Sequence, residues 1–93
     1  MAAISIGDCT VTVEAAGSGF NLVKIVTPAT ADDGDTIDAS SYFTGDEVIS
    51  ASCQASTDGW LPVAAISTAG TITIPGSTDN EARTIYVLCK YGI

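Results

Sequence analysis

The stretch Arg83-Thr84-Ile85-Tyr86-Val87-Leu88-Cys89-Lys90-Tyr91 decides the fold. Its side chains alternate, as in an extended chain, and the apolar set on one side is Ile85, Val87, Cys89 and Tyr91. The other side carries Tyr86 and Leu88, so both sides are apolar as far as Leu88. Because a strand that is apolar on both sides needs cover on both sides, we expect a central strand or an edge strand that another subunit covers.

The same alternation of β-branched residues continues upstream. The further segments that we expect to be strands are 9–13, 20–27, 47–55, 60–66 and 71–74. In the segment 47–55 the apolar side is expected to consist of Ile49, Ala51, Cys53 and Ala55. Ile4 and Ile6 have the opposite parity to the strand that follows them, which predicts a bulge or a bend at Gly7-Asp8.

Polar segments rich in Gly, Asp and Ser separate these strands. Residues 29–41 are expected to form a surface loop with a short extended piece at Thr36-Ile37-Asp38, and Thr68-Ala69-Gly70 is expected to close a hairpin. The pattern predicts a single all-β domain over residues 1–93, an antiparallel β-sandwich or small barrel of six to seven short strands.

The chain carries eleven acidic residues against three basic ones, a net charge of −8. Binding to nucleic acid or to anionic lipid needs a cationic surface, so we expect neither nucleic acid nor a membrane among its partners. The chain has no histidine, which removes the commonest general base and metal ligand. It also has no nucleophile or phosphate-loop motif, so we expect no enzyme and no cofactor.

Cys9, Cys53 and Cys89 each fall on the apolar side of an expected strand. A buried free thiol behaves as a small hydrophobic side chain, and this is the interpretation that the pattern favours. A disulfide between two of the three, or a bond between subunits, stays open as an alternative.

Four carboxylates stand close together in one loop: Asp32, Asp33, Asp35 and Asp38. Calcium favours such oxygen-rich loops, but the order of residues in a calcium-binding EF-hand is absent, so they are weak calcium candidates. Aspartate and glycine are also the ordinary residues of β-turns. We therefore expect the loop 32–38 to face solvent.

Three aromatic residues near expected loop ends are candidates for an interface: Trp60, Tyr42 and Phe43. Tryptophan and tyrosine are enriched at the energetic centres of protein interfaces. Trp60 begins an expected strand directly after the turn Asp58-Gly59, so it is either a core-edge residue or an anchor for a partner.

Two passages have a familiar order of residues: Val26-Thr27-Pro28-Ala29-Thr30-Ala31-Asp32-Asp33-Gly34-Asp35-Thr36-Ile37-Asp38, and Thr71-Ile72-Thr73-Ile74-Pro75-Gly76-Ser77-Thr78-Asp79-Asn80 leading into Arg83-Thr84-Ile85-Tyr86-Val87. In these passages the chain resembles small β-rich virion structural proteins of tailed bacteriophages. The resemblance spans residues 23–91.

This resemblance implies a non-enzymatic subunit, most similar to the capsid decoration or cement subunits that stabilise a phage head lattice. Its partners would be the major capsid protein or other virion proteins, and it would be present as a homo-oligomer in the virion. The start Met1-Ala2-Ala3-Ile4-Ser5-Ile6 lacks the features of a secretory signal, which fits synthesis in the host cytoplasm. A collar, tail or fibre protein and a small sandwich that binds a glycan or a host surface stay open as alternatives.

Overall fold

The computed structural model describes residues 3–17, 20–55, 59–62, 65–75 and 79–90. These residues form β-strands and two short 3-10 helices, η1 (Ile6–Asp8) and η2 (Gly45–Glu47). The all-β class predicted from the alternation is confirmed. Within the described ranges, no helix is long and apolar enough to cross a bilayer. Tyr91, expected on the last strand, lies outside the described residues.

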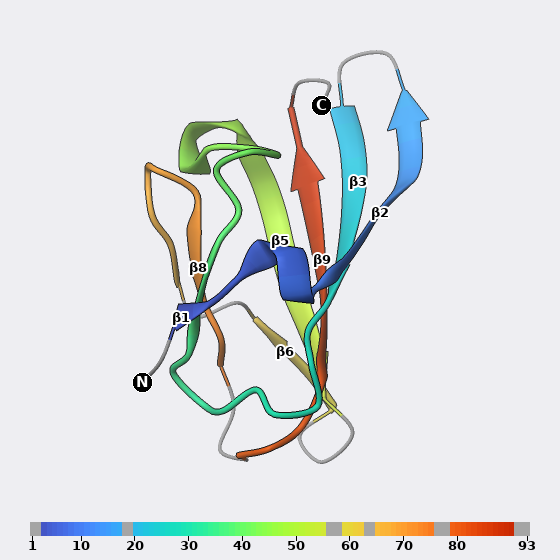
Figure 1. Ribbon diagram of the computed structural model, residues 1–93. Coiled ribbons are helices and arrows are strands. Elements are labelled where there is room, and N and C mark those ends of the chain that lie inside the picture. Colours follow the sequence, from blue (N-terminus) through green and yellow to red (C-terminus); the bar gives the residue numbers. More distant parts are fainter. Residues whose placement is uncertain (1–2, 18–19, 56–58, 63–64, 76–78, 91–93) are drawn as a thin grey trace.

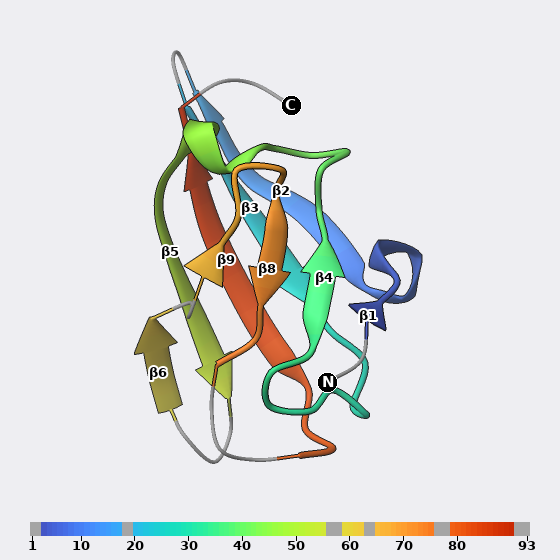
Figure 2. The ribbon, with the colours of Figure 1, turned by 90° about the vertical axis from the view of Figure 1, so that its left-hand side faces the viewer.

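The strands form two sheets that face each other in a sandwich-like arrangement (Figures 1 and 2). The larger sheet has the antiparallel order β2 (Thr10–Gly17), β3 (Phe20–Val26), β9 (Arg83–Cys89), β5 (Val48–Ala55) and β6 (Gly59–Pro62). The smaller sheet has the order β1 (Ala3–Ile4), β4 (Thr36–Asp38), β8 (Thr71–Thr73) and β7 (Ala65–Ile66). In the smaller sheet β1 runs parallel to β4, and the other pairs are antiparallel.

The described part of the chain thus contains nine strand segments, so the expected number of six to seven is wrong. The reason is that the chain changes sheets more often than the alternation reveals. The expected strand 60–66 divides into β6 of the larger sheet and β7 of the smaller one. At the other end, the bend expected at Gly7-Asp8 is present as η1, which carries the chain from β1 to β2.

The last strand is central, as its two apolar sides predict. β9 lies between β3 and β5, with Ile85 beside Ile25 on one side and beside Cys53 on the other. All three of these side chains are fully buried. Central position and burial fit the absence of charged residues between Arg83 and Lys90.

The core fills the space between the two sheets. Its buried side chains are Val23, Ile25, Ala31, Ile37, Ala39, Phe43, Cys53, Ile72, Ile74, Ile85, Val87 and Cys89. Strands of the larger sheet supply about half of them, and the rest come from the smaller sheet and the loops around it. The alternation along β3 and β9 places every second residue of these strands in this core.

One expected core residue points elsewhere. Ile49 is 52% exposed, although the strict alternation placed it with Ala51 and Cys53. The pairing of β5 with β9 shifts register between Val48 and Ser50, so Val48 packs against the core in its place. A bulge inserts an extra residue and reverses the parity of everything before it.

Candidate functional site

The side of the larger sheet that faces away from the smaller sheet carries large apolar side chains among mostly uncharged polar ones. Strands β3 and β9 supply Phe20, Leu22, Lys24, Val26, Thr84, Tyr86 and Leu88 to this side. Strands β5 and β6 add Ser50, Ser52, Gln54 and Trp60. We call the surface formed by these eleven residues the outer face.

The register of the sheet arranges the outer face in rows. Leu22 lies beside Leu88, and in the next row Lys24 lies beside Tyr86. Trp60 lies on the edge strand β6, is 61% exposed, and contacts the ring of Tyr86 with their centroids 5.8 Å apart. Phe20 is 52% exposed. The outer face therefore offers large apolar side chains at two separate places, on β3 and on β6.

The outer face is nearly uncharged although the chain has a net charge of −8. Of the eleven residues that define it, Lys24 is the one charged residue, and none is a carboxylate. Exposed carboxylates lie elsewhere on the described part of the chain, for example those of Asp33, Asp46 and Asp79. A surface of this kind can approach another apolar surface without bringing like charges together.

The structure separates the three expected interface residues. Trp60 lies on the outer face and is open to solvent. Tyr42 is half-buried and packs against the core. Phe43 is only 2% exposed and belongs to the core, so its assignment to an interface is corrected: its side chain has no surface to present.

Sequence reasoning did not identify Phe20 and Leu22 as part of this surface. Their parity is opposite to that of Val23 and Ile25, which are fully buried. The signal was therefore present in the alternation along 20–27, in the same way as it was for Tyr86 and Leu88. The alternation could not show whether another layer of the chain covers that side, and none of the described residues does.

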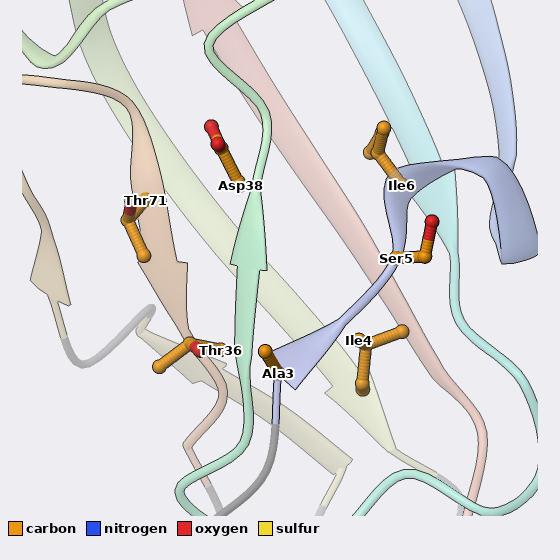
Figure 3. Close-up of a pocket in the computed structure, with 7 residues that line it drawn as sticks. All are labelled: Ala3, Ile4, Ser5, Ile6, Thr36, Asp38 and Thr71. Atoms are coloured by element: carbon orange, nitrogen blue, oxygen red, sulfur yellow. The ribbon is translucent and has the colours of Figure 1, made fainter.

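A groove lies beside the smaller sheet, between β1 and the strands β4 and β8 (Figure 3). It is an open groove of about 540 Å³ lined by Ala3, Ile4, Ser5, Ile6, Thr36, Asp38 and Thr71. The groove exists because β1 pairs with β4 over only Ala3 and Ile4 before the chain turns into η1. Figure 3 shows Asp38 and Thr71 on neighbouring strands, across the groove from Ile6.

Asp38 is the one titratable residue among those that line the groove. Hydrogen bonds from the side chain and the backbone of Ser40 lower its pKa, and the backbone N–H donates to Oδ1 at 3.0 Å. The carboxylate therefore stays charged below its ordinary range. The other polar lining groups are hydroxyls, and a lone carboxylate with hydroxyls contains no pair of an acid and a base for catalysis.

The acidic loop is held by its own carboxylates. Asp35 is buried and accepts a hydrogen bond from the backbone N–H of Asp32 at 2.9 Å. The carboxylate of Asp32 accepts the backbone N–H of Asn80 at 2.9 Å, and that of Asp79 accepts the N–H of Asp33 at 3.3 Å. The expectation that the whole of 32–38 faces solvent is thus corrected, since Asp35 and Ile37 are buried.

These hydrogen bonds give the carboxylates of Asp32 and Asp35 backbone partners within the fold. In the part of the chain that the structure describes, no group of three or more His, Cys, Asp or Glu side chains is gathered to hold one. Asp38, the fourth calcium candidate, lies in the groove and is hydrogen-bonded to Ser40. Loop residues of this type commonly replace missing backbone partners in turns.

None of the three cysteines, all of which the structure describes, is in a disulfide. Cys53 and Cys89 are fully buried in the core, and Cys9 is half-buried at the end of η1. Cys53 on β5 lies beside Ile85 on β9. Ile85 precedes Cys89 by four residues on the same side of β9, so the pairing of the two strands holds the thiols of Cys53 and Cys89 apart. Burial raises the pKa of Cys9 and of Cys89, and the nearby carboxylates of Asp8 and Glu47 respectively raise it further.

No known protein family, no curated protein and no solved structure matches the chain.

Proposed function

We propose that this protein is a non-enzymatic structural subunit of a virion, a capsid decoration subunit that docks on the phage head through its outer face. The observation that supports this proposal is the outer face itself, in which Trp60 and Phe20 are more than half exposed on a surface with no carboxylate. Apolar groups of this size are costly to leave in water and are typical of interaction sites.

The size of the outer face sets the strength of one contact. The four strands that supply the outer face, at ~4.8 Å spacing, and a length of seven residues at ~3.4 Å per residue give a footprint of roughly 19 Å by roughly 24 Å. This is about half of the ~800 Å² per partner of a standard stable interface. One subunit would then bind weakly, and durable attachment would come from many copies bound to one lattice.

Binding of this kind stabilises a shell by mass action. A subunit that binds the assembled lattice but not its dissociated parts shifts the equilibrium towards the assembled state. The net charge of −8 keeps the free subunits apart in solution, while the uncharged outer face is available for the lattice.

The test is co-sedimentation of the purified protein with expanded heads and with tail tubes of a tailed phage that encodes it. The decoration proposal expects saturable binding to heads and none to tail tubes. Trp60→Ala and Phe20→Glu are expected to reduce binding at least tenfold, since buried aromatic anchors contribute about 2 kcal/mol or more each. Thr68→Ala and Thr68→Glu, at an exposed turn residue outside the outer face, are the matched controls.

The outcome also distinguishes the decoration proposal from the alternative functions. Binding to tail tubes instead of heads would move the protein to the collar, tail or fibre class. Binding to heads that Trp60→Ala and Phe20→Glu leave unchanged would mean that another surface makes the contact. Absence of binding to either part of the particle would end the structural proposal.

A second candidate function has one observation in its favour. Trp60 and Tyr86 form an aromatic pair on an open sheet face, and exposed aromatic rings are the usual platform for a sugar ring. A glycan array tests this candidate: saturable binding of a glycan that Trp60→Ala abolishes would favour a recognition module over decoration.

A further inference from the structure

The groove beside the smaller sheet has one apolar wall and one polar wall. The half-buried side chains of Ile4 and Ile6 form the wall on the side of β1 and η1. Across from them, Asp38 on β4 and Thr71 on β8 lie beside each other in the register of the two strands. In Figure 3 the Asp38 carboxylate lies between Thr71 on one side and Ile6 on the other. The groove therefore places a hydrophobic surface next to a negatively charged group.

The charge of Asp38 is accessible and is not neutralised by a basic residue of the described ranges. Its side chain is exposed, and its pKa is lowered by hydrogen bonds from Ser40, which are neutral donors, and not by a basic side chain. Of the three basic residues of the chain, Lys24 lies on the outer face and Arg83 is fully buried. The hydrogen bonds from Ser40 thus keep the carboxylate ionised without cancelling its charge.

We propose that this groove binds a lysine side chain of a partner protein, with its methylene stem against Ile4 and Ile6 and its ammonium group at Asp38. The stem of a lysine covers apolar surface while its charged end stays at a polar site. The ammonium group also carries three N–H donors and needs several acceptors around it. Besides the carboxylate, the groove lining offers the hydroxyl oxygens of Thr71 and Ser5.

The acceptors favour an ammonium group over a guanidinium group or a metal ion. A guanidinium is bound best when both oxygens of a carboxylate are available to it, whereas Oδ1 of Asp38 already accepts the N–H of Ser40 at 3.0 Å. Calcium takes about six to eight oxygen ligands, several of them from carboxylates, and Asp38 is the one carboxylate that lines the groove. The compact ammonium group needs neither arrangement.

The shape of the groove and the charge of the chain indicate where the lysine comes from. Sites for small molecules bury most of their ligand, but this groove is open and would leave a small free amine largely uncovered. A lysine on a protein surface is covered from the other side by the protein that carries it. A second copy of this chain does not fit that description, because it also has a net charge of −8 and is repelled. The expected partner is a different protein with a basic surface.

The groove is separate from the outer face. The outer face belongs to the larger sheet and points away from the smaller one, whereas the groove lies beside the smaller sheet. A subunit that is docked through its outer face would keep the groove accessible. The inference therefore goes beyond the proposed function and does not rest on it.

An NMR titration of the isotopically labelled full chain tests the proposal. The probe is α-N-acetyl-lysine amide, and the control is α-N-acetyl-norleucine amide, which has the same four-carbon stem without the ammonium group. In roughly 0.02 M salt we expect the lysine probe to shift the amide signals of Asp38, Ser40 and Thr71 in a saturable way, and the shifts to weaken as salt rises. Half-saturation is expected at roughly 10 mM, since one exposed ion pair contributes little. The norleucine probe is expected to leave these signals unchanged.

Two pairs of variants connect the binding to individual groups. Asp38→Asn removes the charge but keeps an oxygen that accepts from Ser40, and is expected to weaken binding about fivefold. Asp46→Asn makes the same change in net charge at an exposed residue outside the groove, and is expected to bind as the wild type does. Thr71→Val is expected to weaken binding about threefold. Thr73→Val, on the same strand but outside the groove lining, is its control.

Three results would overturn the proposal. The norleucine probe could shift the same signals as strongly, which would make the groove a merely apolar site. Asp38→Asn could bind the lysine probe as tightly as Asp46→Asn does. The amides of Asp33 and Asp79 could shift as much as those of the groove, which would show a diffuse attraction of cations to an acidic chain. Because these measurements use the isolated protein, failure here leaves the co-sedimentation test of the proposed function unaffected.

Discussion

Trp60 and Tyr86 lie on strands that are not neighbours, yet their rings are in contact. Strand β5 separates β6 from β9, a distance of about 9.6 Å at the usual strand spacing. The ring centroids are only 5.8 Å apart, with an interplanar angle of 39°. The two rings therefore incline towards each other across β5, where the outward residues Ser52 and Gln54 have smaller side chains.

A double-mutant cycle measures what this contact contributes. We expect Trp60→Ala and Tyr86→Ala to be coupled by about 0.5–1.5 kcal/mol, the usual range for an aromatic pair. Trp60→Ala alone is expected to lower the free energy of unfolding by about 1 kcal/mol, because most of its ring is already in water. Urea denaturation of the wild type, both single variants and the double variant checks this.

The loss of stability in Trp60→Ala is compared with that in Ile85→Ala. Ile85 is fully buried, and truncation of such a residue costs about 2–5 kcal/mol. If Trp60→Ala proved as destabilising as Ile85→Ala, the indole would belong to the folded scaffold. It would then be poorly suited as an anchor that a partner covers.

Gly70 is expected to be sensitive to replacement for two reasons. Its φ is +94°, and a Cβ atom there would lie 2.5 Å from the carbonyl oxygen of Phe43. Gly70→Ala is expected to lower the free energy of unfolding by about 2–3 kcal/mol, through the backbone conformation and the steric clash together. Thermal or urea denaturation measures the change.

Two other glycines separate these causes. Gly59 has a φ of +73° but open space around its Cβ position, so Gly59→Ala reports the backbone conformation alone, at about 1 kcal/mol. At Gly7 a Cβ would meet only the Ser5 hydroxyl at 3.5 Å, and we expect Gly7→Ala to be nearly neutral. Equal costs at all three positions would contradict the close approach inferred at Gly70.

The strands that could be predicted are those with uninterrupted alternation. The expected strands 20–27 and 47–55 correspond to β3 and β5, and Thr36-Ile37-Asp38 is β4. The sequence could not show which sheet each strand joins, because alternation reports burial and not the identity of the neighbour. This is why the segment 60–66 was expected to be one strand although it serves two sheets.

The outer face was only partly predictable for a related reason. The exposure of Trp60 was among the alternatives, but Phe43 was assigned to the surface although it is 2% exposed. A single aromatic residue near a loop has no periodicity that indicates its side. Ile49 was wrongly assigned to the buried side of its strand, because the alternation does not reveal a bulge.

Arg83 is a charged residue at the start of the central strand, and it is fully buried. Its guanidinium Nη1 donates to the carbonyl oxygens of Ala31 and Glu81, and its backbone N–H donates to the Thr27 hydroxyl at 2.8 Å. It thus holds the acidic loop against β9. Arg83→Met keeps the volume but leaves the two carbonyl oxygens without this donor, which is expected to cost about 1–3 kcal/mol.

Hydrogen exchange locates that effect. In Arg83→Met the amide of Glu81, which donates to the Ala31 carbonyl at 3.0 Å, is expected to exchange faster, whereas the amide of Val23 in β3 is expected to exchange as before. Thr27→Val is the milder control, because it removes the hydroxyl that accepts from the Arg83 backbone N–H and donates to the Pro28 carbonyl oxygen but leaves the guanidinium in place. Uniformly faster exchange across β3 would show that Arg83 supports the whole sheet and not the loop.

The protonation of Cys89 makes the free energy of unfolding depend on pH in the alkaline range. Burial, and then the carboxylate of Glu47, raise its pKa above the ordinary 9.0 in the folded chain. The folded state thus holds this proton more tightly than the unfolded state does. The resulting stability is fully present below about pH 9 and is lost as pH rises through the higher pKa of the folded state.

The Cys89→Ala variant isolates this contribution. At pH 7 it is expected to be less stable than the wild type by about 1–2 kcal/mol, because it leaves a small cavity in the core. As pH rises from 8 to 10.5 the wild type loses the contribution of the thiol and the variant does not, so the difference between them should shrink. Urea midpoints at each pH measure it, and because every residue other than Cys89 is the same in both proteins, contributions from the rest of the chain cancel. A difference that stays constant up to pH 10.5 would mean that the Cys89 thiol keeps the same pKa when the chain unfolds.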